Sequence, residues 1–229
     1  MGTVQPLAAV AEVVHRRAPR AALHTDAVQA APYLDLAAAT GPCDLVSVSG
    51  HKLGGPKGVG ALVVRHPHRV APMLHGGGQE AERRSGTHDV AGAVGLATAL
   101  AMAAGRRAEE SRRVGALRDR FATAVTGSVP GTVETVPRGS ALPGHCHLRF
   151  AGVDREDLLV LLDEAGVCAS GGSSCASGAL EPSHVLLAMG LSPGEARTGV
   201  RFTLGHTTTA EEVDRAAREV VASVARLRR

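Results

Sequence analysis

The chain is poor in aromatic residues, since its 229 residues include no Trp, one Tyr and three Phe. Hydrophobic residues still make up 44% of it, which predicts a folded chain with a core built mainly of Ala, Val and Leu. The formal net charge is only +3, and the arginines are spread along predicted helical faces. Without a basic block or interleaved aromatic residues, the sequence does not predict a nucleic-acid-binding surface.

Long apolar runs are missing as well, and no stretch approaches the ~20 residues that a membrane-spanning helix requires. The N-terminus shows no signal-peptide core, and Pro6 stands where a myristoylation signal requires Ser or Thr. Cysteines are few and form no CxxC pair: Cys43, Cys146, Cys168 and Cys175. In a chain of this length they predict free thiols in a reducing cytoplasm, not a disulfide framework.

The first part of the chain alternates helical and strand patterns. Apolar residues recur at helical spacing over residues 4–17. Three short patterns are typical of strands, at 22–26, 44–49 and 60–65. This alternation predicts an α/β sheet with some parallel strands. Ligands bind beyond the carboxyl ends of such strands, where Asp26 and the segment after Ser49 fall.

The second part has a different pattern. A helical segment runs from Val90 to about Ala124, as two helices or as one helix with a break near Gly105. Predicted strands and capped helices follow it: strands at 132–137, 145–150 and 200–204, a helix capped by Asp154 and ended by Gly166, and a final helix opened by the capping box Thr209–Glu212. We therefore expect part of an α/β domain over residues 1–106 and a smaller α+β domain over 107–229.

Two motifs carry candidate chemistry in the first domain. SGHKLGGPKG (49–58) follows a predicted strand, and a lysine in such a loop can form a Schiff base with a carbonyl cofactor. By position alone, Lys52 is more typical of a solvated surface lysine. The loop is not a Walker A motif, because Pro56 occupies the lysine position. Asp26 could pair with a cationic ring nitrogen of a cofactor, or it could cap the next helix.

A third motif, ASGGSSCASG (169–178), has the composition of a flexible linker with Cys175 in its middle. It could be a plain connector, a phosphate cradle or an arm that carries a reactive sulfur. His145, Cys146 and His147 lie in a predicted strand, where neighbouring side chains point to opposite faces, so no metal site is expected there.

Several motifs in order carry a family resemblance: HTDAVQ (24–29), SGHK and GGPKGVG (49–60), HGGGQE (75–80), RRSGT (83–87), SGGSSCASGALEPSHVLLAMG (170–190) and VRFTLGHTTT (200–209). Together they resemble the cysteine desulfurase family, the NifS-like branch of the class V aminotransferases. The resemblance implies part of the type I pyridoxal-phosphate transferase fold, with a mostly parallel large domain and a small C-terminal domain. It matches the C-terminal part of the family and not its N-terminal segment.

The resemblance also implies roles for residues of the first domain. Lys52 would bind pyridoxal 5'-phosphate covalently, and Asp26 would hold its pyridinium nitrogen. Gln29 would contact the phenolic oxygen of the cofactor. Ser49 and His51 would bind its phosphate.

Three further residues receive roles in the same way. Thr87 would reach the phosphate of a neighbouring subunit, which implies a dimeric site. Arg201 would bind the substrate carboxylate, and Cys175 would accept sulfur as a persulfide. The remaining cysteines are expected to be buried packing residues: Cys43, Cys146 and Cys168.

The implied activity is conversion of L-cysteine to L-alanine, with sulfur passed to Cys175 for iron–sulfur cluster assembly or another sulfur-transfer pathway. Expected partners are L-cysteine and a sulfur acceptor such as an iron–sulfur scaffold protein. The chain would form a homodimer or pair with a chain that supplies the N-terminal half. Three alternatives remain: a class V aminotransferase, a selenocysteine lyase, and a truncated or non-catalytic half of a split desulfurase.

Overall fold

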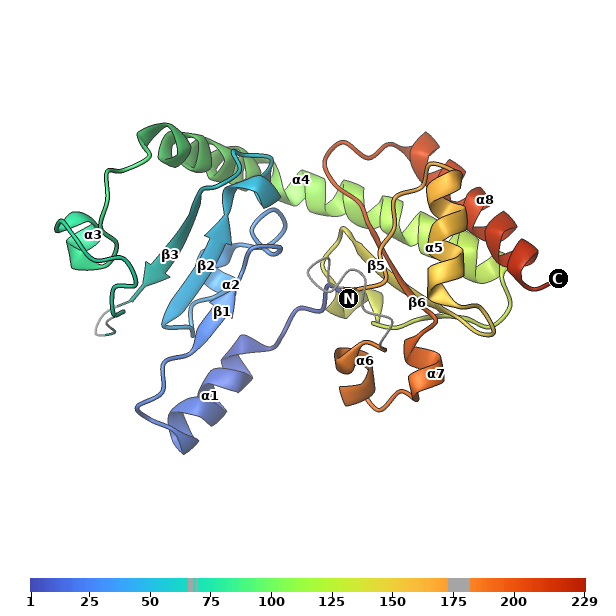
Figure 1. The fold of residues 1–229 in the computed structure, drawn as a ribbon, viewed down its shortest axis with the longest axis horizontal. Coiled ribbons are helices and arrows are strands. Elements are labelled where there is room, and N and C mark those ends of the chain that lie inside the picture. Colours follow the sequence, from blue (N-terminus) through green and yellow to red (C-terminus); the bar gives the residue numbers. More distant parts are fainter. Residues whose placement is uncertain (66–67, 69, 173–181) are drawn as a thin grey trace. The chain divides into compact units, whose positions relative to one another are not determined.

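The computed structural model describes residues 1–65, 68, 70–172 and 182–229. They form two compact units (Figure 1). The N-terminal unit is Gln5–Ala108, and the C-terminal unit is Glu109–Arg229 together with Met1–Val4. The long helix α4 (Val90–Ser128) contributes its first part to one unit and the rest to the other. No helix in the described part of the chain is long and apolar enough to cross a membrane.

The N-terminal unit is built on a three-stranded sheet in the order β1 (His24–Asp26), β2 (Leu45–Ser49) and β3 (Gly60–Val64). Strands β1 and β2 are parallel, while β2 and β3 are antiparallel. Short helices and turns complete it: α1 (Leu7–Arg17), α2 (Leu36–Ala39), the 3-10 turn η1 (Gly50–Leu53) and α3 (Gln79–Glu82). The predicted α/β sheet with parallel strands is confirmed.

Alternation along β2 gives this sheet two different faces. Val46 and Val48 are buried on one face, while Ser47 and Ser49 belong to the other. Val46 joins a small core cluster that also contains Ala27 and Cys43. The buried valines therefore anchor one side of the sheet, and the two serines lie on the other.

The C-terminal unit contains an antiparallel sheet in the order β4 (Thr132–Glu134), β5 (His145–Phe150) and β6 (Gly199–Thr203). Its other elements are the 3-10 turn η2 (Arg138–Ser140), α5 (Arg155–Glu164), α6 (His184–Ala188), α7 (Pro193–Ala196) and α8 (Ala210–Leu227). Asp154 caps α5, and the predicted capping box opens α8. These helix boundaries follow the sequence signals closely.

The main core lies in the C-terminal unit and uses every phenylalanine of the chain. Phe121, Phe150 and Phe202 are all at most 4% exposed. The rings of Phe121 and Phe202 lie 4.8 Å apart between centroids at an angle of 54°. Such a pair contributes roughly 0.5–1.5 kcal/mol beyond its burial. Aliphatic residues of α4, α5, β5, β6 and α8 complete the core around them.

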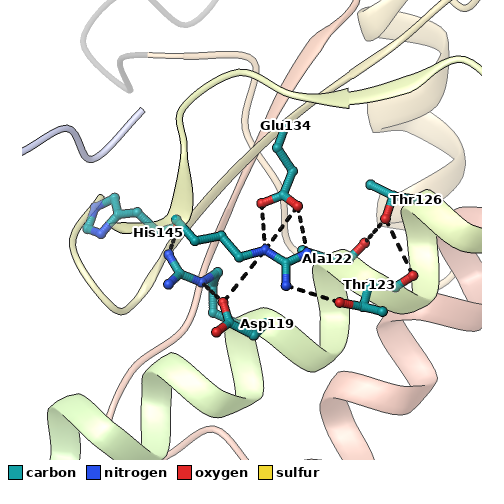
Figure 2. A network of polar contacts seen from close by, with 8 residues as sticks. Asp119, Ala122, Thr123, Thr126, Glu134 and His145 are labelled. Atoms are coloured by element: carbon teal, nitrogen blue, oxygen red, sulfur yellow. Dashed lines mark hydrogen bonds and ion pairs between the residues drawn. The ribbon is translucent and has the colours of Figure 1, made fainter. Parts of the chain in front are cut away.

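A polar network fastens α4 to the sheet of this unit (Figure 2). Arg138 donates from Nε and Nη2 to the Glu134 carboxylate, at 3.0 and 2.6 Å, and from Nη1 to Thr123 Oγ1 on α4. The buried Arg118 bonds Asp119 at 2.6 Å and the His145 carbonyl at 3.3 Å. These bonds join the ends of β4 and β5 to one side of α4.

Helix α4 runs unbroken over 39 residues, so the predicted break near Gly105 is wrong. Gly105 is exposed, and a Cβ there would meet nothing within 4 Å. Its neighbours are Ala, Arg and Glu, which favour helix strongly enough to offset a glycine cost of about 1 kcal/mol.

Candidate functional site

The candidate site begins at the carboxyl edge of the parallel pair β1–β2. Asp26 is the last residue of β1 and lies opposite Ser47 in the register. Ser49 is the last residue of β2, and Lys52 lies in the η1 turn that follows. Parallel strands end on the same side of a sheet, so the topology brings these three groups to one edge.

Several polar side chains lie near this edge, on the face of the sheet that carries Ser47 and Ser49. His24 Nε2 lies 2.8 Å from Ser47 Oγ across the two strands. Ser49 Oγ lies 2.8 Å from His51 Nδ1 at the end of β2. His24 and Ser47 were not predicted as site residues, although the polar residues of β1 and the alternation along β2 were the signals that could have identified them.

Asp26 does not cap a helix, because turns follow β1. Its Oδ1 accepts a hydrogen bond of 2.9 Å from the Val28 amide, and the Ala27 amide bonds the Ser47 carbonyl at 3.0 Å. The helix-capping alternative is therefore wrong. Asp26 is exposed, and Gln29 is exposed in the same turn.

The loop that carries Lys52 is closed by its own backbone. Gly50 donates to the Val59 carbonyl and Gly55 donates to the Gly50 carbonyl, both at 2.9 Å. A Cβ at Gly50 would lie 2.8 Å from the Pro56 carbonyl oxygen, so only glycine fits without a shift. The turn is fixed while the Lys52 side chain stays exposed.

The same loop packs against the first part of α4. A Cβ at Gly95 would lie 2.5 Å from Pro56 Cγ, and one at Gly55 would lie 3.0 Å from Ala99 Cβ. These glycines allow helix and loop to approach closely. The backbone that presents Lys52 is thus supported by a long helix, which suits a residue that must be held in position.

Two further family-like motifs meet in the N-terminal unit. Ser85 Oγ donates to the Gly77 carbonyl at 2.6 Å, and the Gly86 amide donates to Gln79 Oε1 at 3.2 Å. These bonds join HGGGQE to RRSGT. Thr87 follows directly and is exposed. Its role toward a neighbouring subunit stays a prediction.

Arg201 lies in the C-terminal unit, in the middle of β6. Its register partner on β5 is His147, and on its other side it forms an isolated bridge with Ser170. His147 Nδ1 lies 2.8 Å from Thr135 Oγ1. Burial lowers the pKa of His147 to about 4, and the amino terminus and neighbouring arginines act in the same direction. The residue beside Arg201 is therefore a neutral imidazole at neutral pH.

This lowered pKa predicts a pH dependence of folding. An unfolded histidine has a pKa of about 6.5, so unfolding takes up a proton between pH 6.5 and about 4. The contribution of His147 is fully present above pH 6.5 and is lost as the pH falls toward 4. At roughly 1.4 kcal/mol per pKa unit, the whole loss is on the order of 3–4 kcal/mol.

Denaturant unfolding of the wild type and of His147→Gln, measured from pH 4.5 to 8, checks this prediction. As the pH falls, the wild type should lose more free energy of unfolding than His147→Gln does. His206→Gln, which changes an exposed histidine of the same unit, is the matched control. Parallel curves for the wild type and His147→Gln would show that His147 does not titrate in this way.

Comparison with known proteins identifies the family of the chain. A family model described as aminotransferase class-V matches residues 1–216. The chain belongs to the class-V aminotransferase family. Its predicted fold is confirmed by a solved NifS-like protein, which is 31% identical, has a TM-score of 0.85, and is matched over 96% of this chain and 57% of its own.

Cysteine desulfurases are among the curated relatives of this class-V chain. An IscS-like cysteine desulfurase of Mycobacterium tuberculosis is 41% identical over 230 residues, covering 100% of this chain and 58% of the relative. Cysteine desulfurase NifS of Azotobacter vinelandii is 42% identical over 205 residues, covering 90% and 51%. The chain thus spans about half the length of the relatives that it matches.

The cysteines of this family member differ in environment. Cys43 and Cys146 are buried, as predicted, and burial raises the pKa of Cys146 to about 12. Cys168 is exposed, so its assignment to packing is wrong. It follows the turn at Gly166 and precedes the bridge at Ser170, outside any strand. Cys175 lies outside the described residues.

An open groove of about 590 Å³ in the C-terminal unit involves none of the predicted site residues. Its charged lining residues are Arg149, Asp154, Glu195 and Arg197. The two positive and two negative side chains cancel, so the groove has no net charge that would favour a cationic or an anionic ligand. In the described parts of the chain, no group of three His, Cys, Asp or Glu residues could hold a metal ion.

Proposed function

We propose that this chain forms part of a pyridoxal-phosphate-dependent cysteine desulfurase that converts L-cysteine to L-alanine. The observation that carries the proposal is the edge of β1–β2, where Asp26, the Ser49–His51 pair and Lys52 come together. The desulfurase relatives support the same reaction.

The residues at this edge fit the cofactor by their chemistry. A protonated ring nitrogen needs a carboxylate, and Asp26 ends β1 with an exposed side chain. A phosphate needs donors, which the Ser49 hydroxyl and the His51 imidazole supply from adjacent positions 2.8 Å apart. An aldehyde needs a primary amine, and Lys52 is presented on a closed turn. Gln29 and Thr87 would add contacts to the phenolic oxygen and to the phosphate of a neighbouring subunit.

The bound cofactor would supply an electron sink for negative charge that develops at the substrate Cα. The Asp26 carboxylate would keep a proton on the ring nitrogen, and the Lys52 amine would accept the Cα proton of L-cysteine. Arg201 would bind the substrate carboxylate with two parallel N–H···O bonds. Arg201 would thus orient the substrate, and Lys52 would remove one proton from its Cα.

Sulfur transfer then needs a nucleophile, and we assign it to the thiolate of Cys175. It attacks the sulfur of L-cysteine, so that an S–S bond forms and the Cβ–S bond breaks. The electron pair of the broken bond stays with the substrate, whose Cβ takes up a proton. L-cysteine and the Cys175 thiol thus become L-alanine and a Cys175 persulfide, with no external oxidant or reductant.

The persulfide implies a second partner that collects sulfur. We propose an acceptor protein such as an iron–sulfur scaffold, and a dimeric enzyme in which Thr87 reaches the neighbouring site. The active assembly would also include the part of the family that this chain does not span.

Replacement of Cys175 by Ala tests this function in the active protein that contains the chain. We expect sulfide release from L-cysteine to fall by roughly 10³-fold, because the nucleophile is lost. The absorption change caused by L-cysteine binding to the cofactor should remain. Cys168→Ala, which removes an exposed thiol seven positions away, should keep nearly full activity.

Other outcomes would contradict desulfuration through Cys175. Full turnover of an amino acid by Cys175→Ala, with transfer of its amino group, would identify a class V aminotransferase. Turnover of L-selenocysteine but not of L-cysteine by the wild type would identify a selenocysteine lyase.

A further inference from the structure

Arg201 is held in a row of four residues on one face of the C-terminal sheet. His147 is its register partner on β5, and the Thr135 amide donates to the His147 carbonyl at 2.9 Å. On the other side, Arg201 and Ser170 exchange two backbone hydrogen bonds of 2.7 and 3.1 Å. Paired residues of an antiparallel ladder place their side chains on the same face. The row therefore runs Thr135, His147, Arg201, Ser170.

The hydroxyl of Ser170 forms hydrogen bonds with both Arg201 and the backbone of Gly172. It accepts a hydrogen bond of 3.4 Å from Arg201 Nη2. It also donates to the Gly172 carbonyl at 3.0 Å and accepts from the Gly172 amide at 3.3 Å. A serine hydroxyl has one donor and two acceptor positions, so these three bonds use its full capacity.

The backbone next to Ser170 is fixed from a second side. Arg155, which is buried at the start of α5, donates to the Gly171 carbonyl at 3.3 Å. A Cβ at Gly171 would lie 2.5 Å from Arg155 Cδ, so the approach of this side chain needs a glycine. The segment at Gly171 and Gly172 thus has a defined place, and Ser170 connects that place to Arg201.

The register partner of Arg201 on β5 adds no charge. His147 is 6% exposed and is neutral at physiological pH, because burial lowers its pKa to about 4. A neutral imidazole thus lies beside Arg201 on β5, and the Ser170 hydroxyl contacts the Arg201 guanidinium from the strand-like bridge on its other side.

We propose that Ser170 is a positioning residue that couples the Arg201 guanidinium to the backbone at Gly172. Carboxylate binding at Arg201 and the conformation of Gly172 then depend on the same hydroxyl. The proposal rests on the proposed function, which makes Arg201 the substrate-carboxylate ligand. It adds a link between substrate recognition and the backbone at Gly172.

The test compares Ser170→Ala and Ser170→Thr with the wild type. In Ser170→Ala we expect the KM for L-cysteine to rise about tenfold with a smaller change in kcat, because the guanidinium loses the contact with the Ser170 hydroxyl that helps to orient it. Ser170→Thr keeps a hydroxyl and should restore most of the affinity. Ser192→Ala is the matched control, since it removes a hydroxyl of the same unit that is hydrogen-bonded to Glu195.

A second readout needs no catalysis. Amide hydrogen exchange at Gly172 should be faster in Ser170→Ala, since the bond from Gly172 to the hydroxyl is lost. L-alanine, which carries the same carboxylate as the substrate, should slow this exchange in the wild type and not in Ser170→Ala.

The two readouts separate this proposal from the proposed function. Unchanged KM and unchanged Gly172 exchange in Ser170→Ala, with normal wild-type turnover, would overturn the positioning role alone. Equal increases of KM in Ser170→Ala and Ser192→Ala would overturn it too. Faster Gly172 exchange in Ser170→Ala, combined with a wild type that never turns over L-cysteine, would support the Ser170 contact and contradict the desulfurase assignment.

Discussion

Lys52→Ala is expected to lower the rate of L-cysteine desulfuration by at least roughly 10³-fold in the active protein. The variant loses the amine that attaches the cofactor and the base that accepts the Cα proton, and proton transfer alone contributes roughly 10²–10⁴-fold. The measurement is sulfide and L-alanine production with saturating pyridoxal phosphate.

The chain offers a matched control for this change. It contains only two lysines, Lys52 and Lys57, and both lie in the same loop. Lys57 is exposed beyond the closed turn, so Lys57→Ala should keep its rate within about a factor of two. Equal losses in the two variants would assign the effect to the loop and remove Lys52 from its proposed role.

Arg201→Ala is expected to raise the KM for L-cysteine by roughly 100-fold, which corresponds to about 2.8 kcal/mol. The reason is the loss of two charge-assisted hydrogen bonds to the substrate carboxylate. Arg201→Lys keeps the charge but loses the planar pair of donors, so its KM should be intermediate. Steady-state kinetics over a wide range of L-cysteine concentrations measure both.

Arg149→Ala is the control for the Arg201 variants, since it removes another guanidinium on the same sheet, beside Gly199 in the register. Its KM should stay close to that of the wild type. A large increase of KM in Arg149→Ala, without one in Arg201→Ala, would move the carboxylate-binding role from Arg201 to Arg149.

Much of the candidate site followed from the sequence because it depends on short-range signals. Alternation in residues 44–49 predicted a strand, and glycines around Lys52 predicted a tight turn after it. Asp26 could be placed at a strand end for the same reason. Parallel pairing then brings these groups to one edge, which is a general property of α/β sheets.

The features that were missed depend on pairing between distant segments. His24 and Ser47 touch only because β1 and β2 align in one register. The contact of Ser170 with Arg201 joins residues 31 positions apart. It depends on an isolated β-bridge, which no local sequence pattern predicts. Cys168 was assigned to the core by residue type, but the turn at Gly166 brings it to the surface.

The most direct measurement of the central claim is borohydride trapping of pyridoxal phosphate on the chain, followed by peptide mass spectrometry. Reduction fixes the cofactor to the amine that holds it, and the chain has only two lysines to choose between. We predict that the label is found on Lys52, that Lys57→Ala labels normally, and that Lys52→Ala does not label. Labelling of Lys57 instead, or equal labelling of the wild type and Lys52→Ala, would contradict the account.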